Sequence, residues 1–368
     1  MTAPDDARWM HAALALAARG LGRVAPNPAV GCMIVAQGRA VGRGWTQPGG
    51  RPHAERVALD RAGAAARGAD VYVTLEPCAH YGKTPPCADA LIAAGVARVI
   101  CPLTDPDRRV AGRGFARLRA AGITVDVGLM ADAAAALNIG FLMRHSAGRP
   151  HLTLKLAATL DGRIATATGE SQWISGPEAR AEAHLLRARS DAILVGAGTV
   201  IADDPALNVR LPGMEDRSPI PVILSAQARA PLTLALVRDA PRRGTMMVHG
   251  PDAPPARLAA LGGAGVRCLA APLGADGRLS LAGAMQALGA AGITRAMCEG
   301  GGSIAAALLA EDLVDELVWV SAGMLIGAEG VAGVGPLGLR RLADAPRFAR
   351  TEARSVGADL LSRWVREG

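Results

Sequence analysis

The most informative stretch of this chain runs Val73-Thr74-Leu75-Glu76-Pro77-Cys78-Ala79-His80-Tyr81-Gly82-Lys83-Thr84-Pro85-Pro86-Cys87. It follows His53-Ala54-Glu55 along the chain. One imidazole (His53) and two thiolates (Cys78 and Cys87) supply three zinc ligands, one fewer than the closed tetrahedron of a structural zinc site. A site with three protein ligands leaves a position for water, whose pKa the metal lowers toward neutrality. Glu55, two residues after the ligand His53, is placed to move protons between that water and a substrate.

His-x-Glu combined with Pro-Cys and a second Cys is the signature of zinc-dependent deaminases. The spacing here is unusual, because the second thiol, Cys87, lies farther from Cys78 than in the common Pro-Cys-x-x-Cys arrangement. A closed structural site with His80 as a fourth ligand is the alternative. That alternative leaves the His-x-Glu pair unexplained.

Strand and helix patterns alternate on both sides of this stretch. The N-terminal part predicts helices at 7–19, 53–67, 86–94 and 112–121. It predicts strands at 29–36, 39–45, 69–75, 96–102 and 123–127, of which the first two form a hairpin. This alternation indicates an α/β layer with a largely parallel sheet and an antiparallel edge hairpin.

A segment of small and helix-breaking residues at 146–150 predicts a linker. Beyond it a second alternation begins, with helices between strands at 151–157, 191–196, 221–224, 245–249, 296–299 and 316–320. A chain of 368 residues exceeds the size at which single cores stop growing. We therefore expect two α/β domains, at 1–147 and 148–368.

Residues 73–87 closely resemble the deaminase half of the bifunctional deaminase/reductase family of riboflavin biosynthesis. The segments Pro26-Asn27-Pro28-Ala29-Val30-Gly31, Asp105-Pro106-Asp107 and Val110-Ala111-Gly112-Arg113-Gly114 match further parts of that half. The resemblance implies a cytidine-deaminase-like domain with three α/β/α layers, in which Glu55 is catalytic. It also implies that Asn27, His80 and Lys83 hold the pyrimidine and its ribose phosphate. From the residues alone, Asn27 equally suits a turn, and His80 a supporting or surface imidazole.

The second half of the chain resembles the reductase half of the same family at 153–164, 169–175, 196–210 and 298–303. That half has a dihydrofolate-reductase-like α/β fold and uses NADPH. The resemblance implies cofactor contacts from Ala157, Trp173, Thr199, Asp203, Gly301, Gly302, Ser303, Ile304, Ala305, Ala306 and Ala307. It implies substrate contacts from Lys155, Ser171, Arg187, Leu207, Arg210 and Glu299.

The reductase residues also have plainer interpretations. The glycines at 300–302 let a backbone approach an anion at a helix N-terminus, but they also suit a tight turn. The alternatives for single residues are packing for Trp173, a strand-end charge for Lys155, and solvated charges for Arg187 and Arg210. The chain departs from the family pattern at two places. It has Ser225-Ala226 where the family usually has Asp followed by Ser or Thr, and Ala322-Gly323-Met324 where the family often has Ala-Pro-Lys.

The composition limits the classes of partner. Net charge is +7, from 40 basic and 33 acidic residues, and Lys83 and Lys155 are the only lysines. Three Phe, two Tyr and five Trp are few for a protein that stacks single-stranded nucleic acid on aromatic rings. No apolar run of about 18 residues lacks charge, which excludes a spanning helix, and the acidic N-terminus does not suit a signal peptide. We expect a cytoplasmic protein without disulfides, in which Cys32, Cys101, Cys268 and Cys298 are inert buried thiols.

The resemblance therefore implies a bifunctional enzyme with Zn²⁺ and NADPH as cofactors. Zinc-dependent hydrolytic deamination of 2,5-diamino-6-(5-phosphoribosylamino)pyrimidin-4-one would precede NADPH-dependent reduction of the ribosyl group, giving 5-amino-6-(5-phosphoribitylamino)uracil. The partner is this small molecule, with neither nucleic acid nor membrane, and the family resemblance implies a homo-oligomer. Two alternatives remain open, a tRNA or nucleic-acid deaminase and a zinc-stabilised binding module whose second domain is inactive.

Overall fold

The computed structural model describes residues 3–81 and 85–367. The chain divides into two compact units, Met1–Gly148 (unit 1) and Arg149–Gly368 (unit 2). Each unit has its own sheet and its own buried core. No helix in the described part of the chain has the length and apolar character needed to cross a bilayer.

Unit 1 is built around a mixed sheet with the strand order β2-β1-β3-β4-β5. Its strands are β1 (Gly31–Ala36), β2 (Arg39–Trp45), β3 (Asp70–Val73), β4 (Arg98–Cys101) and β5 (Thr124–Val127). Its helices are α1 (Ala3–Ala17), α2 (Ala54–Ala62), α3 (Cys87–Ala94), α4 (Arg113–Ala120), α5 (Ala131–Leu137) and α6 (Ile139–Ala147), with 3-10 turns at Ala18–Gly20, Pro48–Gly50 and Gly63–Ala66. Strand β1 pairs antiparallel with both β2 and β3, whereas β3, β4 and β5 run parallel.

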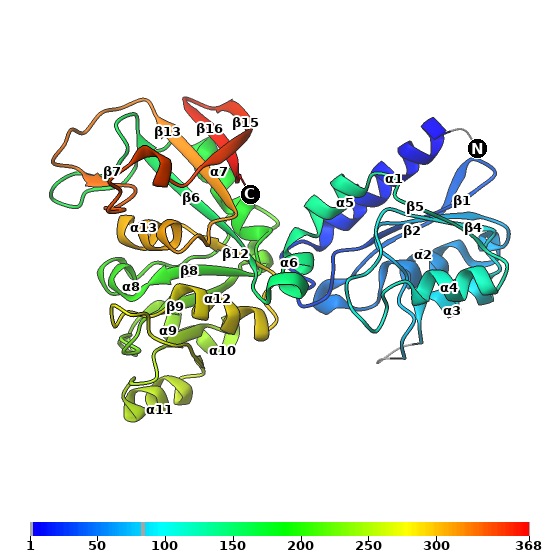
Figure 1. The fold of residues 1–368 in the computed structure, drawn as a ribbon, viewed down its shortest axis with the longest axis horizontal. Coiled ribbons are helices and arrows are strands. Elements are labelled where there is room, and N and C mark those ends of the chain that lie inside the picture. Colours follow the sequence, from blue (N-terminus) through cyan, green and yellow to red (C-terminus); the bar gives the residue numbers. More distant parts are fainter. Residues whose placement is uncertain (1–2, 82–84, 368) are drawn as a thin grey trace. The chain divides into compact units, whose positions relative to one another are not determined.

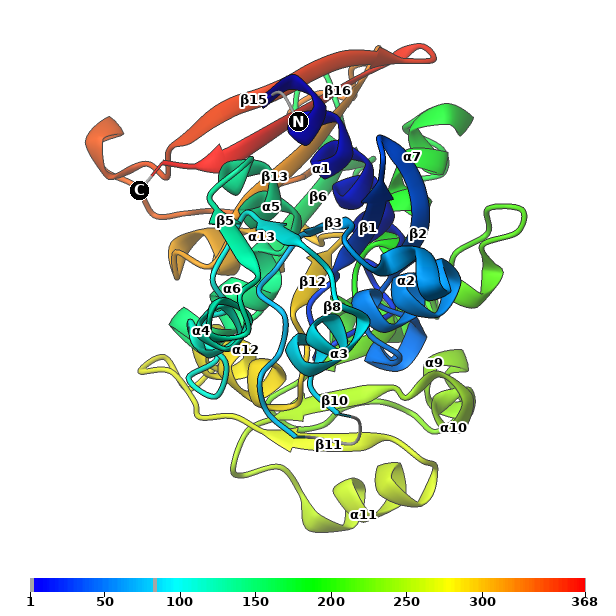
Figure 2. The same ribbon diagram turned by 90° about the vertical axis from the view of Figure 1, so that its right-hand side faces the viewer.

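The alternation of side chains along β1 explains the three layers of unit 1. Cys32 and Ile34 face a core that α2, α3, α4 and α6 complete, whereas Met33 and Val35 face a second core with α1 and α5. Successive side chains of a strand point to opposite faces, so a fully apolar strand requires helices on both sides. Figures 1 and 2 show this sandwich of helices and sheet within unit 1.

Glycines let the zinc-ligand segment approach the sheet closely. A β-carbon on Gly44 would lie 2.2 Å from the carbonyl oxygen of Ala54, and one on Gly42 would lie 2.3 Å from that of Ala58. Helix α2 therefore packs directly on the backbone of β2, at a distance that only glycine permits. This contact fixes the first turn of α2, which carries Glu55.

Unit 2 is built around a sheet with the order β11-β10-β9-β8-β12-β6-β13-β16-β15. Its strands are β6 (His151–Thr159), β8 (Ala192–Gly196), β9 (Ile220–Leu224), β10 (Met246–His249), β11 (Arg267–Ala270), β12 (Arg295–Cys298), β13 (Glu316–Ala322), β15 (Phe348–Val356) and β16 (Asp359–Arg366), with β7 (Arg163–Ala165) and β14 (Val331–Ala332) forming a separate ribbon. Its helices are α7 (Pro177–Ala188), α8 (Ala197–Asp203), α9 (Ala235–Arg238), α10 (Ala240–Arg243), α11 (Pro255–Gly263), α12 (Leu281–Ala290) and α13 (Gly302–Ala310), with 3-10 turns at Glu215–Arg217 and Leu342–Asp344.

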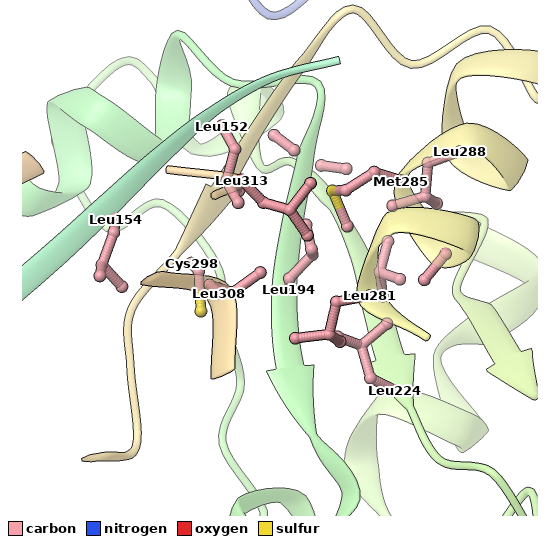
Figure 3. Close-up of a cluster of buried hydrophobic side chains, with 14 of the residues drawn as sticks. Leu152, Leu154, Leu194, Leu224, Leu281, Met285, Leu288, Cys298, Leu308 and Leu313 are labelled. Atoms are coloured by element: carbon pink, nitrogen blue, oxygen red, sulfur yellow. The ribbon is translucent and has the colours of Figure 1, made fainter. Parts of the chain in front are cut away.

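The unit 2 sheet is parallel from β11 to β13 and ends in the antiparallel strands β16 and β15. Figure 2 shows β15 and β16 as a long hairpin along one edge. Apolar side chains of β6, β8, β9 and β12 pack against α12 and α13 on one face, and Figure 3 shows Leu308 close to Cys298 in this core. On the other face, β8, β9 and β10 pack against the helices α8 to α11.

The predicted alternation is present in both units, and the antiparallel hairpin at the edge of the first sheet is confirmed. Helices α5 and α6, strand β11, the β7–β14 ribbon and the β15–β16 hairpin have no counterpart among the predicted elements. Cys32, Cys101 and Cys298 are buried as predicted, but Cys268 is half-buried, because β11 is an edge strand.

Candidate active sites of the two units

His53, Cys78 and Cys87 come together in unit 1. Their ligand atoms lie within 4.8 Å of one another. The Sγ atoms of Cys78 and Cys87 lie 3.7 Å and 3.4 Å from Nδ1 of His53. Among the residues the structure describes, this is the group able to hold a metal ion, and His80 does not belong to it.

Helix starts position these donors. His53 is the N-cap of α2, and Cys87 is the first residue of α3. The backbone N–H of Cys87 donates to Cys78 Sγ at 3.3 Å. Hydrogen bonds from the Cys87 thiol and the His53 ring lower the pKa of Cys78 to about 4, although burial acts in the opposite direction. A thiolate beside a second thiol and an imidazole is a donor set that fits zinc.

Glu55 lies in the first turn of α2 and is 4% exposed. Burial raises the pKa of its carboxyl group to about 7, although the charge of His53 opposes this shift. A carboxyl group with a pKa near neutrality can both accept and release a proton at ordinary pH. Glu55 therefore has the properties of a general acid–base residue beside the zinc-ligand group.

A cavity of about 550 Å³ opens beside these residues. The candidate substrate residues Asn27 and His80 line it together with His53, Glu55 and Cys78. His80 Nδ1 is buried and has no hydrogen-bond partner among the described residues, so it is available to a ligand. Asn27 donates from Nδ2 to the carbonyl oxygen of Gly50 at 3.0 Å, which fixes its side chain at the cavity wall. Lys83, the third candidate, lies outside the described residues.

Three arginines give the cavity wall a cationic character. Arg51, Arg109 and Arg144 line it, together with His145 of α6. Arg109 forms an ion pair with Asp107 at 2.5 Å. Burial lowers the pKa of His145, which favours its neutral form. Positive charge at this wall therefore comes from arginine side chains.

Glu76 organises the loop that brings Asp105 to the cavity wall. It is 3% exposed and accepts hydrogen bonds from four backbone N–H groups, those of Asp105 (3.1 Å), Gly112 (2.9 Å), Gly114 (2.9 Å) and Phe115 (3.2 Å). Asp105 lines the cavity, and burial raises the pKa of its carboxyl group to about 6. One buried carboxylate thus holds the segment from Asp105 to the start of α4.

Unit 2 has a cavity of about 460 Å³. It contains most of the candidate reductase residues, namely Lys155, Ala157, Ser171, Trp173, Arg187, Thr199, Asp203, Leu207, Arg210, Glu299 and Gly301. The remaining candidates form the first turns of α13 and do not line the cavity; they are Gly302, Ser303, Ile304, Ala305, Ala306 and Ala307. Ala305 is fully buried in the core. Ala226 and Met324, where the chain departs from the family pattern, do not belong to this lining in the described part of the chain.

Arg187 and Glu299 form a bidentate ion pair in this cavity. Arg187 Nη2 donates to Glu299 Oε2 at 2.6 Å, and Nε donates to the other carboxylate oxygen. Burial alone would raise the pKa of Glu299, but the hydrogen bonds and charge of Arg187 outweigh it, and the pKa is lowered. Because Arg187 also donates to the carbonyl oxygen of Asn208 at 2.8 Å, its guanidinium is engaged by the protein itself. It fixes Glu299 rather than adding an independent charge to the cavity.

Lys155 extends from β6 toward this ion pair. Desolvation lowers the pKa of its ammonium group, while the charge of Glu299 opposes that shift. A lysine with a lowered pKa exchanges protons more readily near neutral pH than an exposed lysine does.

The turn before α13 fits an anionic cofactor group. Gly300 and Gly301 have φ values of 98° and 93°, and a β-carbon on Gly302 would lie 2.4 Å from the carbonyl oxygen of Ala332. Only glycine satisfies this geometry, and the helix N-terminus that follows attracts phosphate oxygens. Trp173 lines the same cavity and is 60% exposed. The guanidinium of Arg180 lies over its ring, 4.5 Å from the ring centroid. These features fit the diphosphate and ring of a dinucleotide such as NADPH.

Comparison with known proteins decides the family. Residues 150–362 match the RibD C-terminal domain, and residues 3–103 match the cytidine and deoxycytidylate deaminase zinc-binding region. The riboflavin biosynthesis protein RibD of Escherichia coli K12 is 44% identical over 372 residues, which cover 97% of this chain and 98% of that protein. The chain belongs to the RibD family. The RibD of Haemophilus influenzae is 40% identical over 380 residues, covering 99% and 98% of the two chains.

Solved structures agree with this assignment. Acinetobacter baumannii RibD, form 1, superposes with a TM-score of 0.89 at 39% identity and covers 99% of both chains. A diaminohydroxyphosphoribosylaminopyrimidine deaminase/5-amino-6-(5-phosphoribosylamino)uracil reductase from Thermotoga maritima superposes with a TM-score of 0.84 at 30% identity, covering 98% of this chain and 99% of that one.

As a member of the RibD family, the chain is a bifunctional deaminase and reductase of riboflavin biosynthesis that acts on a small-molecule substrate. The predicted fold class is confirmed, with a cytidine-deaminase-like domain followed by a dihydrofolate-reductase-like domain. The predicted cofactors, zinc and NADPH, are confirmed with it.

Sequence reasoning missed several residues of these RibD-type cavities. It assigned no role to Glu76, although this residue stands inside the quoted zinc-ligand stretch, because its four donors lie 29 to 39 residues further along the chain. It also missed Arg51, Arg109 and Arg144, and in unit 2 it missed Arg180 and His184. In unit 2 the sequence did contain a pattern that could have identified the two residues, because Arg180, His184 and Arg187 follow one face of α7 at helical spacing.

Proposed function

We propose that the unit 1 cavity deaminates 2,5-diamino-6-(5-phosphoribosylamino)pyrimidin-4-one and that the unit 2 cavity reduces the ribosyl group of the product to ribityl. The observation that carries this proposal is that three metal donors, and no fourth among the residues the structure describes, converge beside buried Glu55 in an open cavity. A three-donor site with a neighbouring carboxyl group suits hydrolysis, whereas a structural site would be closed by a fourth donor.

In unit 1, His53, Cys78 and Cys87 would hold the zinc ion. When bound, zinc supplies a Lewis acid that lowers the pKa of a coordinated water. Glu55 would accept one proton from the attacking water and pass it to the pyrimidine nitrogen as the C–O bond forms. It would then take the second proton from the same oxygen and pass it to the amine, which leaves as ammonia as the C–N bond breaks. Asn27 and His80, both at the cavity wall, orient the pyrimidine through hydrogen bonds. General acid–base transfer of this kind contributes about 10²–10⁴-fold to a rate.

The arginines of the cavity wall are the proposed partners of the substrate phosphate, together with Lys83. Arg144 and Arg51 line the cavity, and a phosphate monoester carries close to two negative charges at neutral pH. The pyrimidine would then lie toward His53 and Glu55, and the phosphate toward α6. This orientation is supported by Arg144 of α6, which lines the cavity.

In unit 2, NADPH supplies a hydride when bound. Trp173, Thr199, Asp203 and the turn at Gly301 would hold the cofactor, with the following residues to Ala307 in the helix behind it. Lys155 is suited to give a proton to the ring oxygen of the ribose as the bond between that oxygen and C1′ breaks. Glu299 would stabilise the positive charge left on the C1′–N group, to which the hydride is then added. Ser171, Leu207 and Arg210 complete the wall that receives the substrate.

The proposal includes a homo-oligomeric enzyme that works in a reducing compartment such as the cytoplasm and does not bind nucleic acid. A reducing setting is supported by the two metal-binding thiols, which must stay reduced to bind zinc. The small number of aromatic residues supports a small-molecule substrate over a polynucleotide.

The first experiment is to follow NADPH absorbance after the amino substrate is added to zinc-loaded protein. Loss of NADPH would mean that deamination and reduction occur in sequence on one chain. If NADPH is not consumed, adding the deaminated substrate shows which half is inactive. A tRNA mobility-shift assay tests the nucleic-acid alternative, and sedimentation tests the oligomeric state.

A further inference from the structure

The segment Ala206–Arg210 carries two of the candidate substrate residues of unit 2, Leu207 and Arg210. It belongs to neither a helix nor a strand, so no ladder of backbone hydrogen bonds holds it. Leu207 has a φ of 47°, in the left-handed region that a leucine adopts only at a cost in energy. Such a conformation persists only where the surroundings impose it.

Side chains from distant elements supply that constraint. The N–H of Val209 donates to Ser218 Oγ at 3.0 Å, and the N–H of Arg210 donates to His184 Nδ1 at 3.4 Å. Arg187 holds the carbonyl oxygen of Asn208.

Arg243, the last residue of α10, holds the strained part of the segment. Its Nη2 donates to the carbonyl oxygens of Leu207 at 2.9 Å and Pro219 at 3.0 Å, and its Nη1 donates to that of Ala206. One guanidinium thus joins three carbonyl oxygens through a planar fork of N–H groups, a geometry that the compact ammonium of a lysine does not reproduce. Helix α10 is itself anchored, because Ala240 is buried in the same core cluster as the side chain of Leu207.

We propose that Arg243 is a positioning residue of the reductase site. It does not touch the substrate; it holds the backbone of Ala206 and Leu207 so that Arg210 stands at the cavity wall. This inference rests on the proposed function of unit 2, because it assumes that Leu207 and Arg210 contact the ribose substrate.

The test compares Arg243→Gln with Arg242→Gln. Arg242 is the adjacent residue of α10, but it is exposed and pairs only with Asp239 among the described residues, at 3.1 Å. We expect Arg243→Gln to raise KM for the deaminated substrate about tenfold to a hundredfold, since small misplacements of binding groups have effects of this size. KM for NADPH and the deaminase rate of unit 1 should stay within about twofold of wild type, and Arg242→Gln should do so in every assay.

A double-variant comparison separates positioning from general support of the fold. If Arg243 acts through Arg210, the double variant Arg210→Gln/Arg243→Gln should have a substrate KM no higher than that of Arg210→Gln alone. Additive losses, or an equal rise in the KM for substrate and for NADPH, would overturn the inference. So would equal behaviour of Arg243→Gln and Arg242→Gln.

Arg243→Lys guards against a variant that fails to fold. It keeps the charge but reaches fewer carbonyl oxygens, so its substrate KM should lie between those of wild type and Arg243→Gln. If Arg243→Gln is insoluble, Arg243→Lys takes its place, and its KM values for substrate and for NADPH are compared with those of Arg242→Gln. A wild-type enzyme that does not oxidise NADPH with the deaminated substrate would instead refute the proposed function of unit 2.

Discussion

The backbone N–H of Gly114 donates to the carboxylate of Glu76 at 2.9 Å, and the two residues are packed so tightly that a β-carbon on Gly114 would lie 3.1 Å from Glu76 Oε1. The same β-carbon would lie 2.1 Å from the carbonyl oxygen of Pro77. The zinc-ligand stretch and the start of α4 are therefore joined through glycine and a buried carboxylate. The wall of the deaminase cavity that contains Asp105 depends on this junction.

Glu76→Gln should destabilise unit 1 and slow deamination. The amide nitrogen of Gln cannot accept a hydrogen bond, so some of the four backbone N–H groups lose their partner, at a cost of about 1–3 kcal/mol for each. Thermal unfolding and the deamination rate measure the effect. Asp132→Asn, at an exposed position of α5, is the control that should change neither. Wild-type stability of Glu76→Gln would show that the loop is held by other contacts.

Glu55→Gln should abolish deamination and spare reduction. Gln keeps the shape of the side chain but cannot accept the proton of water, so the deamination rate should fall about 10²–10⁴-fold. The zinc content should be unchanged, because Glu55 is not among the residues that form the metal-binding group. NADPH oxidation with the deaminated substrate should proceed at the wild-type rate. A parallel loss of reduction would contradict two independent sites.

His80→Ala should keep its zinc, whereas Cys87→Ser should lose it. His80 does not belong to the described group of His53, Cys78 and Cys87, and its Nδ1 is available to the substrate. We expect His80→Ala to raise the KM for deamination while metal analysis still finds one zinc per chain. Loss of zinc from His80→Ala would favour the closed structural site instead. Chelation of the wild type should remove deaminase activity and leave reduction intact.

The deaminase chemistry could be predicted from the sequence because its donors stand in two short segments. In the first segment, His53 and Glu55 are two residues apart. In the second, the carbonyl oxygen of Cys78 accepts a hydrogen bond from the N–H of Ala88 where α3 begins, so local backbone geometry brings Cys78 and Cys87 together. The ion pair of the reductase cavity could not be predicted in this way. Arg187 and Glu299 are 112 residues apart, and only the parallel sheet of unit 2 brings them into contact.

The missed elements have a similar physical explanation. Strand β15 lies at the edge of its sheet, and most of its side chains are exposed or half-buried, so no alternation of apolar residues marks it. Helices α5 and α6 follow each other directly at Leu137 and Ile139, without a breaker between them. Elements of this kind are defined by the packing of the folded chain rather than by a local pattern.

Arg144→Gln should weaken binding of the phosphorylated substrate by unit 1. Loss of one charged hydrogen bond to phosphate is worth about 1.5–3 kcal/mol, or about tenfold to a hundredfold in KM. With a dephosphorylated substrate, wild type and Arg144→Gln should have the same KM. Arg39→Gln, an exposed position at the start of β2, is the matched control. A rise in KM that is equal for both substrates would place the phosphate elsewhere.

Arg187→Gln should invert the dependence of stability on pH in unit 2. In the wild type the pKa of Glu299 is lowered, so its contribution to stability is complete above the unfolded pKa of about 4.3 and is lost as pH falls through the folded value. Without Arg187, burial raises the pKa of Glu299, and stability should then decrease as pH rises above about 4.3.

The unfolding midpoint of Arg187→Gln, measured between about pH 4.5 and 7, should therefore fall with rising pH, whereas that of the wild type should not. Loss of the paired hydrogen bonds should also cost about 1.5–3 kcal/mol near neutral pH. Arg189→Gln, an exposed position at the end of the same helix, is the control and should keep the wild-type profile. Parallel pH profiles for Arg187→Gln and Arg189→Gln would mean that groups other than Arg187 set the charge of Glu299.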